Sequence, residues 1–218
     1  MTFRYSFRNE LPDNHRMARA ERVALGLRAH SGWAVLVALS GPVSAPVVVD
    51  RRRLELCDKS FPRQPYHAAE NLPAAKAEAL VGRSLGTAAK LARAAVLAAV
   101  ETRRRDGQDV AGAGLLLSSS RPLPTELARV LASHALIHTA EGEMYRDVLR
   151  DGCAKAGVEV AGFRERELVA SAAQRLKLAP EAVQARLAAL GKPLGPPWTQ
   201  DEKLASLAAW LVLHGRAS

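Results

Sequence analysis

Three apolar runs separated by short polar turns occupy residues 23–56, and they constrain the fold more than any other part of the chain. The runs VALGLRAH and AVLVALSG flank the turn SGW, and APVVVDRRRLELCD follows a second break. In the third run, the apolar residues Val47, Val49, Leu54 and Leu56 face alternately, as in a strand. Short turns that contain glycine join antiparallel neighbours. The sequence therefore predicts a three-stranded antiparallel meander.

The rest of the chain predicts helices alternating with strands. Three prolines indicate a loop over 58–73, and a long helix is expected from Pro73 to Arg105. The apolar runs at 110–119 and 158–163 are expected to be strands. A helical stretch in two pieces is expected before Gly157. Residues 164–190 are expected to form one or two helices, with Pro180 starting the second. A final helix is expected in WTQDEKLASLAAWLVLHG, with its cap at Thr199 or Gln200. The order β-β-β-α-β-α-β-α predicts an α/β domain whose last two strands join in parallel.

Composition sets the class and the expected location of the protein. The 218 residues are 48% hydrophobic, which is enough for a core, so we expect a basic flexible arm at 1–21 and one domain over 22–218. The start of the chain has no apolar secretory region, and LARAAVLAAV is too short to span a bilayer. Cys57 and Cys153 suggest neither a metal pair nor a disulfide framework. We therefore predict a cytoplasmic protein without a membrane partner.

The formal charge of +9 predicts an acidic partner, and nucleic acid is the first candidate. Arginine forks match phosphate oxygens, so Arg28 and the run Arg51, Arg52 and Arg53 are candidate contacts. Trp198 follows two prolines and is the tryptophan most expected to be exposed for base stacking, whereas Trp210 is expected in the core. Genomic bias toward arginine, or protection of an edge strand, would explain the same residues. A homodimer is left open.

Several known nucleotide-binding and catalytic sequence motifs are missing. GAGLLL lacks the third glycine of the dinucleotide fingerprint, and its glycines precede the strand instead of following it. Neither a phosphate-binding P-loop nor a G-x-S-x-G elbow occurs in the sequence. These absences argue against a dinucleotide enzyme and against a kinase-like function.

Three segments resemble the ribonuclease H-like superfamily, in particular RuvC-type Holliday-junction resolvases. ALGLRAHSGWAVLVAL looks like their first hairpin, and AEGEMYRDVLRDGCAKAGVEVAGFRERELVASAAQRL looks like their later helix-strand-helix. DEKLASLAAWLVLHG is similar to their closing helix, which begins with an aspartate. The resemblance spans about 23–214. It implies a mixed five-stranded sheet flanked by helices.

The resemblance also implies a place for catalysis. Family members carry acids on the first strand, at the end of the fourth strand and on the last helix, and these acids hold two divalent cations, Mg²⁺ or Mn²⁺. Here the first position is Arg28, and the fourth strand ends in Ser118, Ser119 and Ser120. Asp201, with Glu202 beside it, is the acid that matches the last helix. A hard cation needs several oxygen ligands, which the matching positions do not supply.

A second candidate site lies in SHALIHTAEGEMYRD. On a continuous helix, His134, His138 and Glu141 share one face and could bind a transition metal, while Glu143 and Asp147 lie on the opposite face. The alternative is an ordinary exposed helix, and a break at Gly142 would separate His134 from Glu141.

Two functions remain after these arguments. One is a nuclease whose metal is held by Asp201 with Glu141 or Glu143, and with His30 or His138. The other is a catalytically degenerate domain that binds nucleic acid or a protein without cutting. His30, in the first turn, is either a substitute ligand or base or a solvent-facing turn residue. Whether Arg28, His30, Ser118 and Asp201 converge at one pocket is the observation that would be most informative about these functions.

Overall fold

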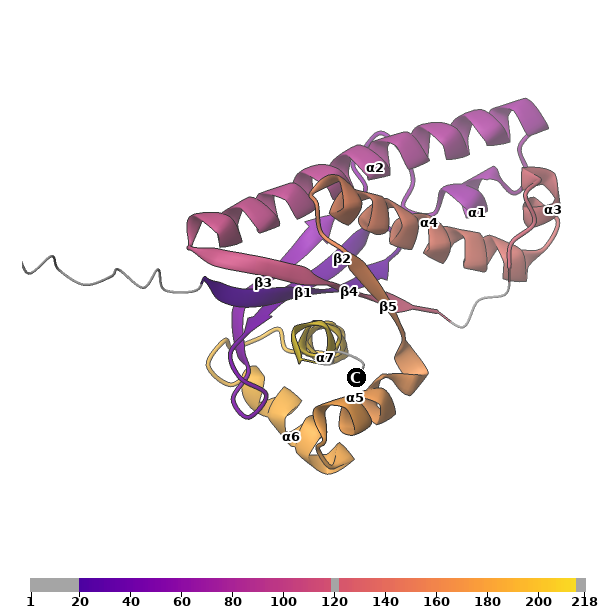
Figure 1. Ribbon diagram of the computed structural model, residues 1–218. Coiled ribbons are helices and arrows are strands. Elements are labelled where there is room, and N and C mark those ends of the chain that lie inside the picture. Colours follow the sequence, from indigo (N-terminus) through magenta and orange to yellow (C-terminus); the bar gives the residue numbers. More distant parts are fainter. Residues whose placement is uncertain (1–19, 119–121, 215–218) are drawn as a thin grey trace, which may run out of the picture.

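The computed structural model describes residues 20–118 and 122–214 and contains one five-stranded mixed sheet (Figure 1). The strands lie in the order β3-β2-β1-β4-β5. The first three pair antiparallel, and β1, β4 and β5 pair in parallel, as the sequence predicts. The strands are β1 (Glu21–His30), β2 (Trp33–Ser40), β3 (Val47–Glu55), β4 (Gln108–Leu117) and β5 (Val160–Arg164).

Helices cover both faces of the sheet (Figure 1). One face carries α1 (Pro65–Ala69), α2 (Ala74–Arg105), α3 (Leu127–Leu131) and α4 (His134–Lys155). The other carries α5 (Leu168–Leu176), α6 (Pro180–Leu190) and α7 (Gln200–His214), and a short 3₁₀ turn (Glu165–Glu167) precedes α5. Among the described residues, no helix has the length and apolar character needed to cross a bilayer.

The expectation of a loop over 58–73 is wrong in part. That segment contains the helix α1, and Pro65 stands at its start, where the missing N–H is not needed. The helical stretch before Gly157 forms two pieces, α3 and α4, as predicted, and the alternative of a break at Gly142 is excluded because Gly142 lies inside a continuous α4. The arm predicted for 1–21 falls outside the described residues except at Ala20 and Glu21, as do Ser119 and Ser120.

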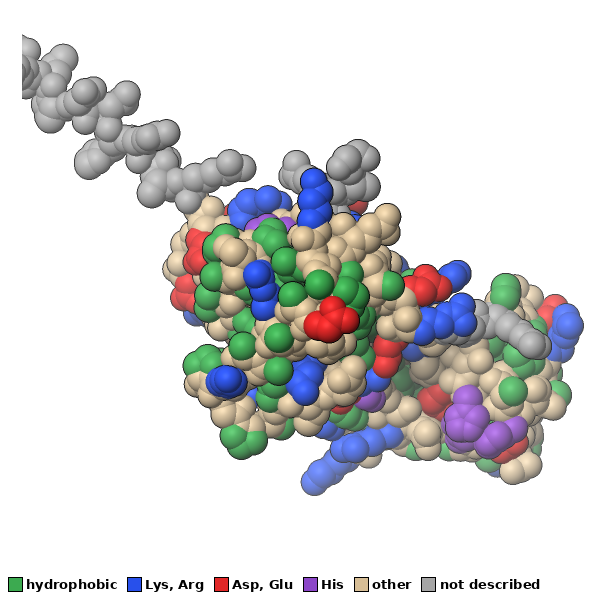
Figure 2. All heavy atoms as spheres, turned by 90° about the horizontal axis from the view of Figure 1, so that it is seen from below, with side chains coloured by type: hydrophobic (Ala, Val, Ile, Leu, Met, Phe, Trp, Pro, Cys, Tyr) green, Lys and Arg blue, Asp and Glu red, His purple; other side chains and the backbone are tan. Residues whose placement is uncertain are grey.

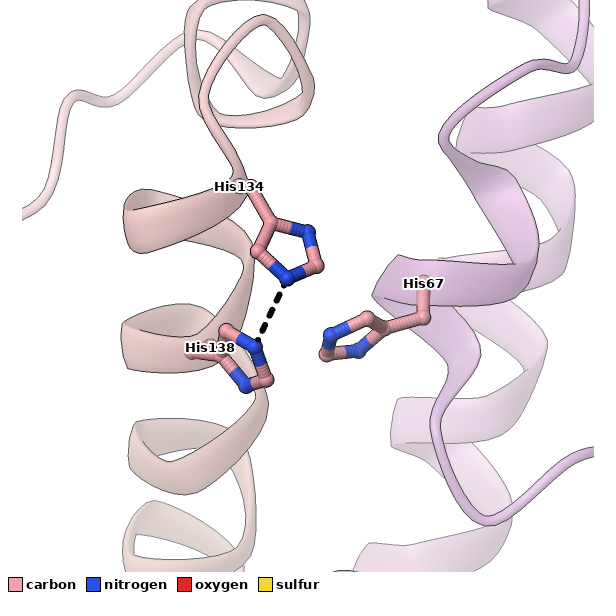
Figure 3. Close-up of side chains that lie close together, drawn as sticks. All are labelled: His67, His134 and His138. Atoms are coloured by element: carbon pink, nitrogen blue, oxygen red, sulfur yellow. Dashed lines mark hydrogen bonds between the residues drawn. The ribbon is translucent and has the colours of Figure 1, made fainter.

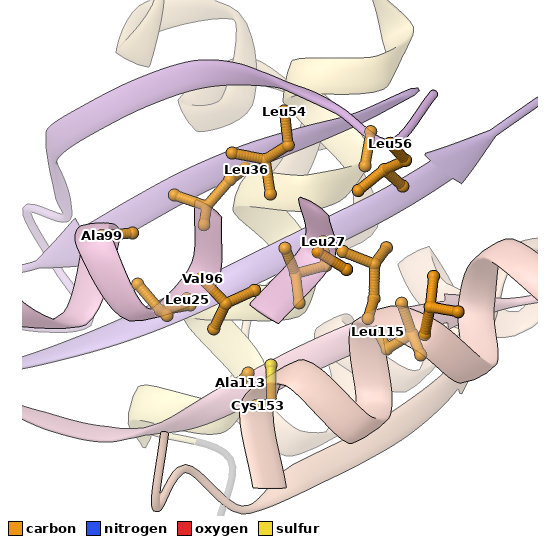
Figure 4. Close-up of a cluster of buried hydrophobic side chains, with 14 of the residues drawn as sticks. Leu25, Leu27, Leu36, Leu54, Leu56, Val96, Ala99, Ala113, Leu115 and Cys153 are labelled. Atoms are coloured by element: carbon orange, nitrogen blue, oxygen red, sulfur yellow. The ribbon is translucent and has the colours of Figure 1, made fainter. Parts of the chain in front are cut away.

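The two faces of β1 look toward different helices. Leu25 and Leu27 are fully buried in a cluster with Val96 of α2 and Leu115 of β4 (Figure 4). Because side chains alternate along a strand, Gly26 and the even-numbered residues after it face the side of α7. Arg28 and His30 therefore project toward the start of α7.

Glycines bring α7 unusually close to the sheet. A Cβ atom on Gly26 would lie 1.8 Å from the carbonyl oxygen of Ala205, and one on Gly114 would lie 2.7 Å from that of Ala208. Only residues without a side chain permit this backbone approach. The small residues of β1, β4 and α7 thus fix the depth at which α7, and with it Asp201, sits over the sheet.

Candidate functional site

The first turn of α7 is held by a reciprocal cap. The backbone N–H and the hydroxyl of Thr199 both donate to the carboxylate of Glu202, each at 2.7 Å, and the N–H of Asp201 donates to the Thr199 hydroxyl at 3.2 Å. This is a capping box, in which side chains satisfy the free N–H groups at a helix start. Burial alone raises the pKa of Glu202, but the hydrogen bonds from Thr199 outweigh it and lower that pKa. The cap sets the position of Asp201.

Arg28, near the end of β1, joins two acidic side chains from later segments. Its guanidinium forms an ion pair with Asp201, and its Nη2 lies 3.0 and 3.1 Å from the two carboxylate oxygens of Glu165. The side chains of Arg28 and Asp201 are 19% and 21% exposed, whereas that of Glu165 is 45% exposed. Because solvent screens exposed pairs, the contact to Asp201 is the firmer one.

His30 lies on the other side of Asp201. Its Nε2 is 3.1 Å from Oδ2 of Asp201, a contact distance without the alignment of a hydrogen bond. The imidazole stacks on Trp33 at 4.2 Å between ring centroids, and the guanidinium of Arg53 lies 3.8 Å from the same indole ring. Burial lowers the pKa of His30, and the charges of Arg28 and Arg53 lower it further. His30 is therefore packed between Trp33 and Asp201, with a side chain that is 29% exposed, and it is not a fully solvent-facing turn residue.

Ser118 completes this group at the end of β4. Its hydroxyl lies 3.0 Å from Nη2 of Arg146 and 3.3 Å from Oε1 of Glu143, and those two residues of α4 also form an ion pair. Arg28, His30, Ser118 and Arg146 line one open hollow of about 410 Å³. Asp201 joins them through its contacts with Arg28 and His30, so Arg28, His30, Ser118 and Asp201 lie close together. We call Arg28, His30, Ser118, Glu165 and Asp201 the arginine-centred site.

The arginine-centred site does not fit two divalent metals. A hard cation needs several oxygen ligands. Here β1 offers a guanidinium, β4 ends in Ser118, and the carboxylates of Asp201 and Glu165 already neutralise Arg28. A positive charge thus lies between the acids, in the place where a metal would be needed.

A separate group of three imidazoles lies where α1 meets α4 (Figure 3). His134 and His138 of α4 approach within 3.0 Å at their Nε2 atoms, and His67 of α1 faces them. We call these three residues the histidine cluster. Glu141 is buried behind it, with Oε2 at 3.0 Å from Nδ1 of His67.

The predicted metal set of Asp201, His138 and Glu141 is not brought together. Asp201 contacts β1 from α7, on one face of the sheet, whereas α4 lies on the other face (Figure 1). Nor is Glu141 the partner of His134 and His138 on an open helix face, since its carboxylate turns to α1 and is 3% exposed. The helical period placed these residues on one side of α4, but packing against α1 divides them.

The other predicted nucleic-acid contacts are engaged within the chain. Arg51 donates to the carbonyl oxygens of Gly195 and Pro197, and Arg52 forms an ion pair with Asp50. Trp198 is partly buried, because its ring packs over Gly191 and its indole N–H donates to the carbonyl of Leu187 at 2.8 Å. Trp198 is therefore more exposed than Trp210, as expected, but its ring is packed against the chain and is not an open platform for base stacking. Trp210 is fully buried, as predicted.

Sequence reasoning missed Glu165 and His67, which belong to these two groups, and Arg146, which lines the hollow beside Arg28. Glu165 directly follows β5, and Arg146 follows Glu143 by three residues, so strand-end position and helical spacing could have indicated both. His67 lies in a proline-rich segment that looked irregular. Pro65 as a first helical residue was the signal for α1, but no local pattern joins His67 to α4.

The arrangement of sheet and helices defines a ribonuclease H-like α/β fold. Among solved structures, the chain is similar to the RuvC structure from Thermus thermophilus, with a TM-score of 0.50 and 15% identity over 86% of this chain and 91% of that one. It is also similar to T. thermophilus RuvC in complex with a Holliday junction substrate, with a TM-score of 0.51 and 13% identity over 87% and 90% of the two chains. At these identities the likeness establishes the fold, in a divergent form. The sequence matches no protein-family model, and no curated protein is similar to it.

Proposed function

We propose that this chain is a ribonuclease H-like domain that binds nucleic acid at the arginine-centred site without metal-dependent cleavage. The observation that carries the proposal is the ion pair of Arg28 with Asp201. The strand position at which the related fold is expected to carry an acid holds a cation instead. Arg28 can offer a phosphate the N–H groups that it now gives to the exposed Glu165, whereas its positive charge disfavours a divalent metal between the two acids.

The charges around the hollow support an anionic ligand. Arg28, Arg146 and Arg166 all line it, and the whole chain carries a formal charge of +9. Arg166 is 65% exposed and makes a contact of 3.5 Å with Glu167, which solvent weakens. The guanidinium of Arg166 can therefore contact a phosphate with little loss of free energy from its contact with Glu167. One of the similar RuvC structures holds a Holliday junction substrate, which makes branched DNA the first ligand to try.

Binding would exchange one anion for another at Arg28. Asp201 holds one side of the guanidinium, and the more exposed Glu165 holds the other. A phosphate oxygen replaces Glu165 at Nη2, while Asp201 keeps the fork oriented. The ring of Trp33 is already covered by His30 and by Arg53, so base stacking on Trp33 is not part of the proposal.

The test combines binding and cleavage on the same DNA. A fluorescently labelled four-way junction and a duplex of the same length are titrated with protein at several salt concentrations, and the junction is then incubated with Mg²⁺ or Mn²⁺. We expect the logarithm of the binding constant to fall linearly with the logarithm of salt concentration, and the junction to remain intact. Arg166→Gln removes one phosphate contact, so it should reduce the magnitude of that slope by about one.

Arg129→Gln is the matched control, because it removes the same charge from an exposed position on α3. It should leave the slope nearly unchanged. Binding that does not respond to salt, or an equal effect of the two substitutions, would contradict the proposed interface. Cleavage that depends on Mg²⁺ and on Asp201 would instead support the nuclease interpretation.

A further inference from the structure

The histidine cluster has the donors of a transition-metal site. Its three ligand nitrogens, one from each of His67, His134 and His138, all lie within 4.8 Å of one another. The three rings point toward a common centre from α1 and α4 (Figure 3), and their centroids are 4.5 to 5.5 Å apart. Metal–nitrogen bonds of about 2.0–2.1 Å require only a small further approach of the rings.

Glu141 orients one of the three imidazoles. Its Oε2 lies 3.0 Å from Nδ1 of His67 and also accepts the backbone N–H groups of Tyr66 and His67, at 3.2 and 3.4 Å. An Nδ1–H that donates to this carboxylate leaves the lone pair of His67 on Nε2, the other ring nitrogen. A carboxylate behind a metal-binding histidine is the usual outer partner of such sites, because it fixes the tautomer and raises ligand basicity.

The buried carboxylate of Glu141 also lacks a full set of partners. The side chain is 3% exposed, and its Oε1 has no hydrogen-bond partner among the described residues. Within the same residues, its ion pair is with His67 and not with an arginine or a lysine. Burying a carboxylate is unfavourable unless positive charge lies near. A cation bound to His67 would supply that charge one residue away.

The surface position of the cluster leaves room for a fourth ligand. His134 and His138 are exposed, and Figure 2 shows histidine side chains gathered on the surface at the end of the molecule formed by α1, α3 and the start of α4. Three nitrogen donors suit Zn²⁺ and its neighbours in the transition series, whereas Mg²⁺ and Ca²⁺ prefer oxygen ligands.

From these contacts we infer that His67, His134 and His138 bind one Zn²⁺-like ion, oriented through Glu141, and that this ion fastens α1 to α4. The fourth coordination position is open to water. This site is separate from the arginine-centred site, because its ligands come from α1 and α4, whereas the residues of the other site come from β1, the end of β4, the 3₁₀ turn and α7.

The experiment uses the full chain without a polyhistidine tag, stripped of metal with a chelator and dialysed. Zn²⁺ is titrated by calorimetry, and Co²⁺ is followed by its visible absorption. We expect one ion per chain. His67→Ala and His138→Ala should each weaken binding by at least about tenfold, and Glu141→Gln by about 10- to 100-fold, the range for loss of an outer partner.

His214→Ala is the control, since this histidine lies on α7 and contacts the carbonyl of Gly41. It should bind Zn²⁺ like the unaltered chain. Circular dichroism of each variant shows whether it folds, and the exposed position of His138 makes His138→Ala the variant least expected to perturb folding. Absence of Zn²⁺ binding, a stoichiometry other than one, or equal losses in His138→Ala and His214→Ala would overturn the inference.

Discussion

The arginine-centred site and the histidine cluster both gather side chains that can bind cations, yet they differ in what surrounds those side chains. In the first, Asp201 and Glu165 are neutralised by Arg28 from the same chain. In the second, the nitrogens of His134 and His138 face each other and His67, and the acid behind them contacts only one ring. On this difference rest our two proposals, an anionic ligand for the first and a metal ion for the second.

The difference shows that position in a fold does not decide chemistry. The arginine-centred site lies where β1 and β4 end, and the cation Arg28 stands between its two acids. The histidine cluster lies away from those strand ends, on helices that cover the opposite face (Figure 1). What each site can bind depends on whether its acidic side chains are already paired with a cation of the same chain.

The two sites also depend on different packing contacts, and Gly26→Ala should disturb only those of the arginine-centred site. A methyl group at position 26 would lie 1.8 Å from the carbonyl oxygen of Ala205, so α7 must move. We expect the free energy of unfolding to fall by about 3 kcal/mol or more, as for severe overpacking. Urea denaturation measures it. In the matched control Gly82→Ala, the new methyl meets open space on a helix and should stabilise by about 0.5–1 kcal/mol. Unchanged stability of Gly26→Ala would contradict the close approach of α7.

Metal addition should affect only the histidine cluster. At a free Zn²⁺ concentration 100 times the dissociation constant, a bound ion stabilises the native state by about 2.7 kcal/mol. Thermal denaturation of the metal-free chain with and without Zn²⁺ measures the shift. His138→Ala should lose it, whereas Arg28→Gln should keep it. A Zn²⁺ shift that survives in His138→Ala would place the metal elsewhere.

Reversing the charge at Arg28 should turn the proposed anion site into a site that binds a cation. Arg28→Asp leaves three carboxylates near one another, so we expect a loss of about 2 kcal/mol of stability without metal. Mg²⁺, which prefers oxygen ligands, should restore part of that loss in Arg28→Asp, less in Arg28→Gln and none in the unaltered chain. Melting temperatures with and without Mg²⁺ test this. Equal stabilisation of all three proteins would mean that Arg28 does not neutralise Asp201.

The smallest expected effect concerns the cap that positions Asp201. The pKa of Glu202 is lowered in the fold, so its contribution to stability is present above its unfolded pKa and is lost as pH falls through the folded value. Glu202→Gln should cost about 1 kcal/mol near neutral pH and should show a weaker loss of stability on acidification. Denaturation at several pH values measures both. Zn²⁺ binding should not change, because the cap lies on α7.

The fold was predictable because its signals are local. The alternating runs of β1 to β3, the length of α2 and the prolines that start later helices all appear in the sequence, and the order of elements then places Arg28 and Asp201 together. Thr199 as the cap of α7 follows from the same kind of pattern.

The sites were less predictable because their members come from distant segments. Helical spacing put Glu141 with His134 and His138, but only the packing of α1 on α4 shows that His67 takes that place. Trp198 is more exposed than Trp210, as predicted, but the sequence did not show that its ring packs over Gly191, seven residues earlier. Such contacts depend on tertiary structure.

The close packing of α7 on β1 and β4 also has a consequence for the synthesis of the chain. Strand β1, the first strand described, is covered by α7, the last helix described, so that face of β1 and β4 is not covered by α7 until α7 has been synthesised. Covering that face requires contacts between segments far apart in the sequence, which form slowly. The nascent chain therefore depends on late docking of α7, and chaperone binding before that step would fall on the uncovered side of β1 and β4.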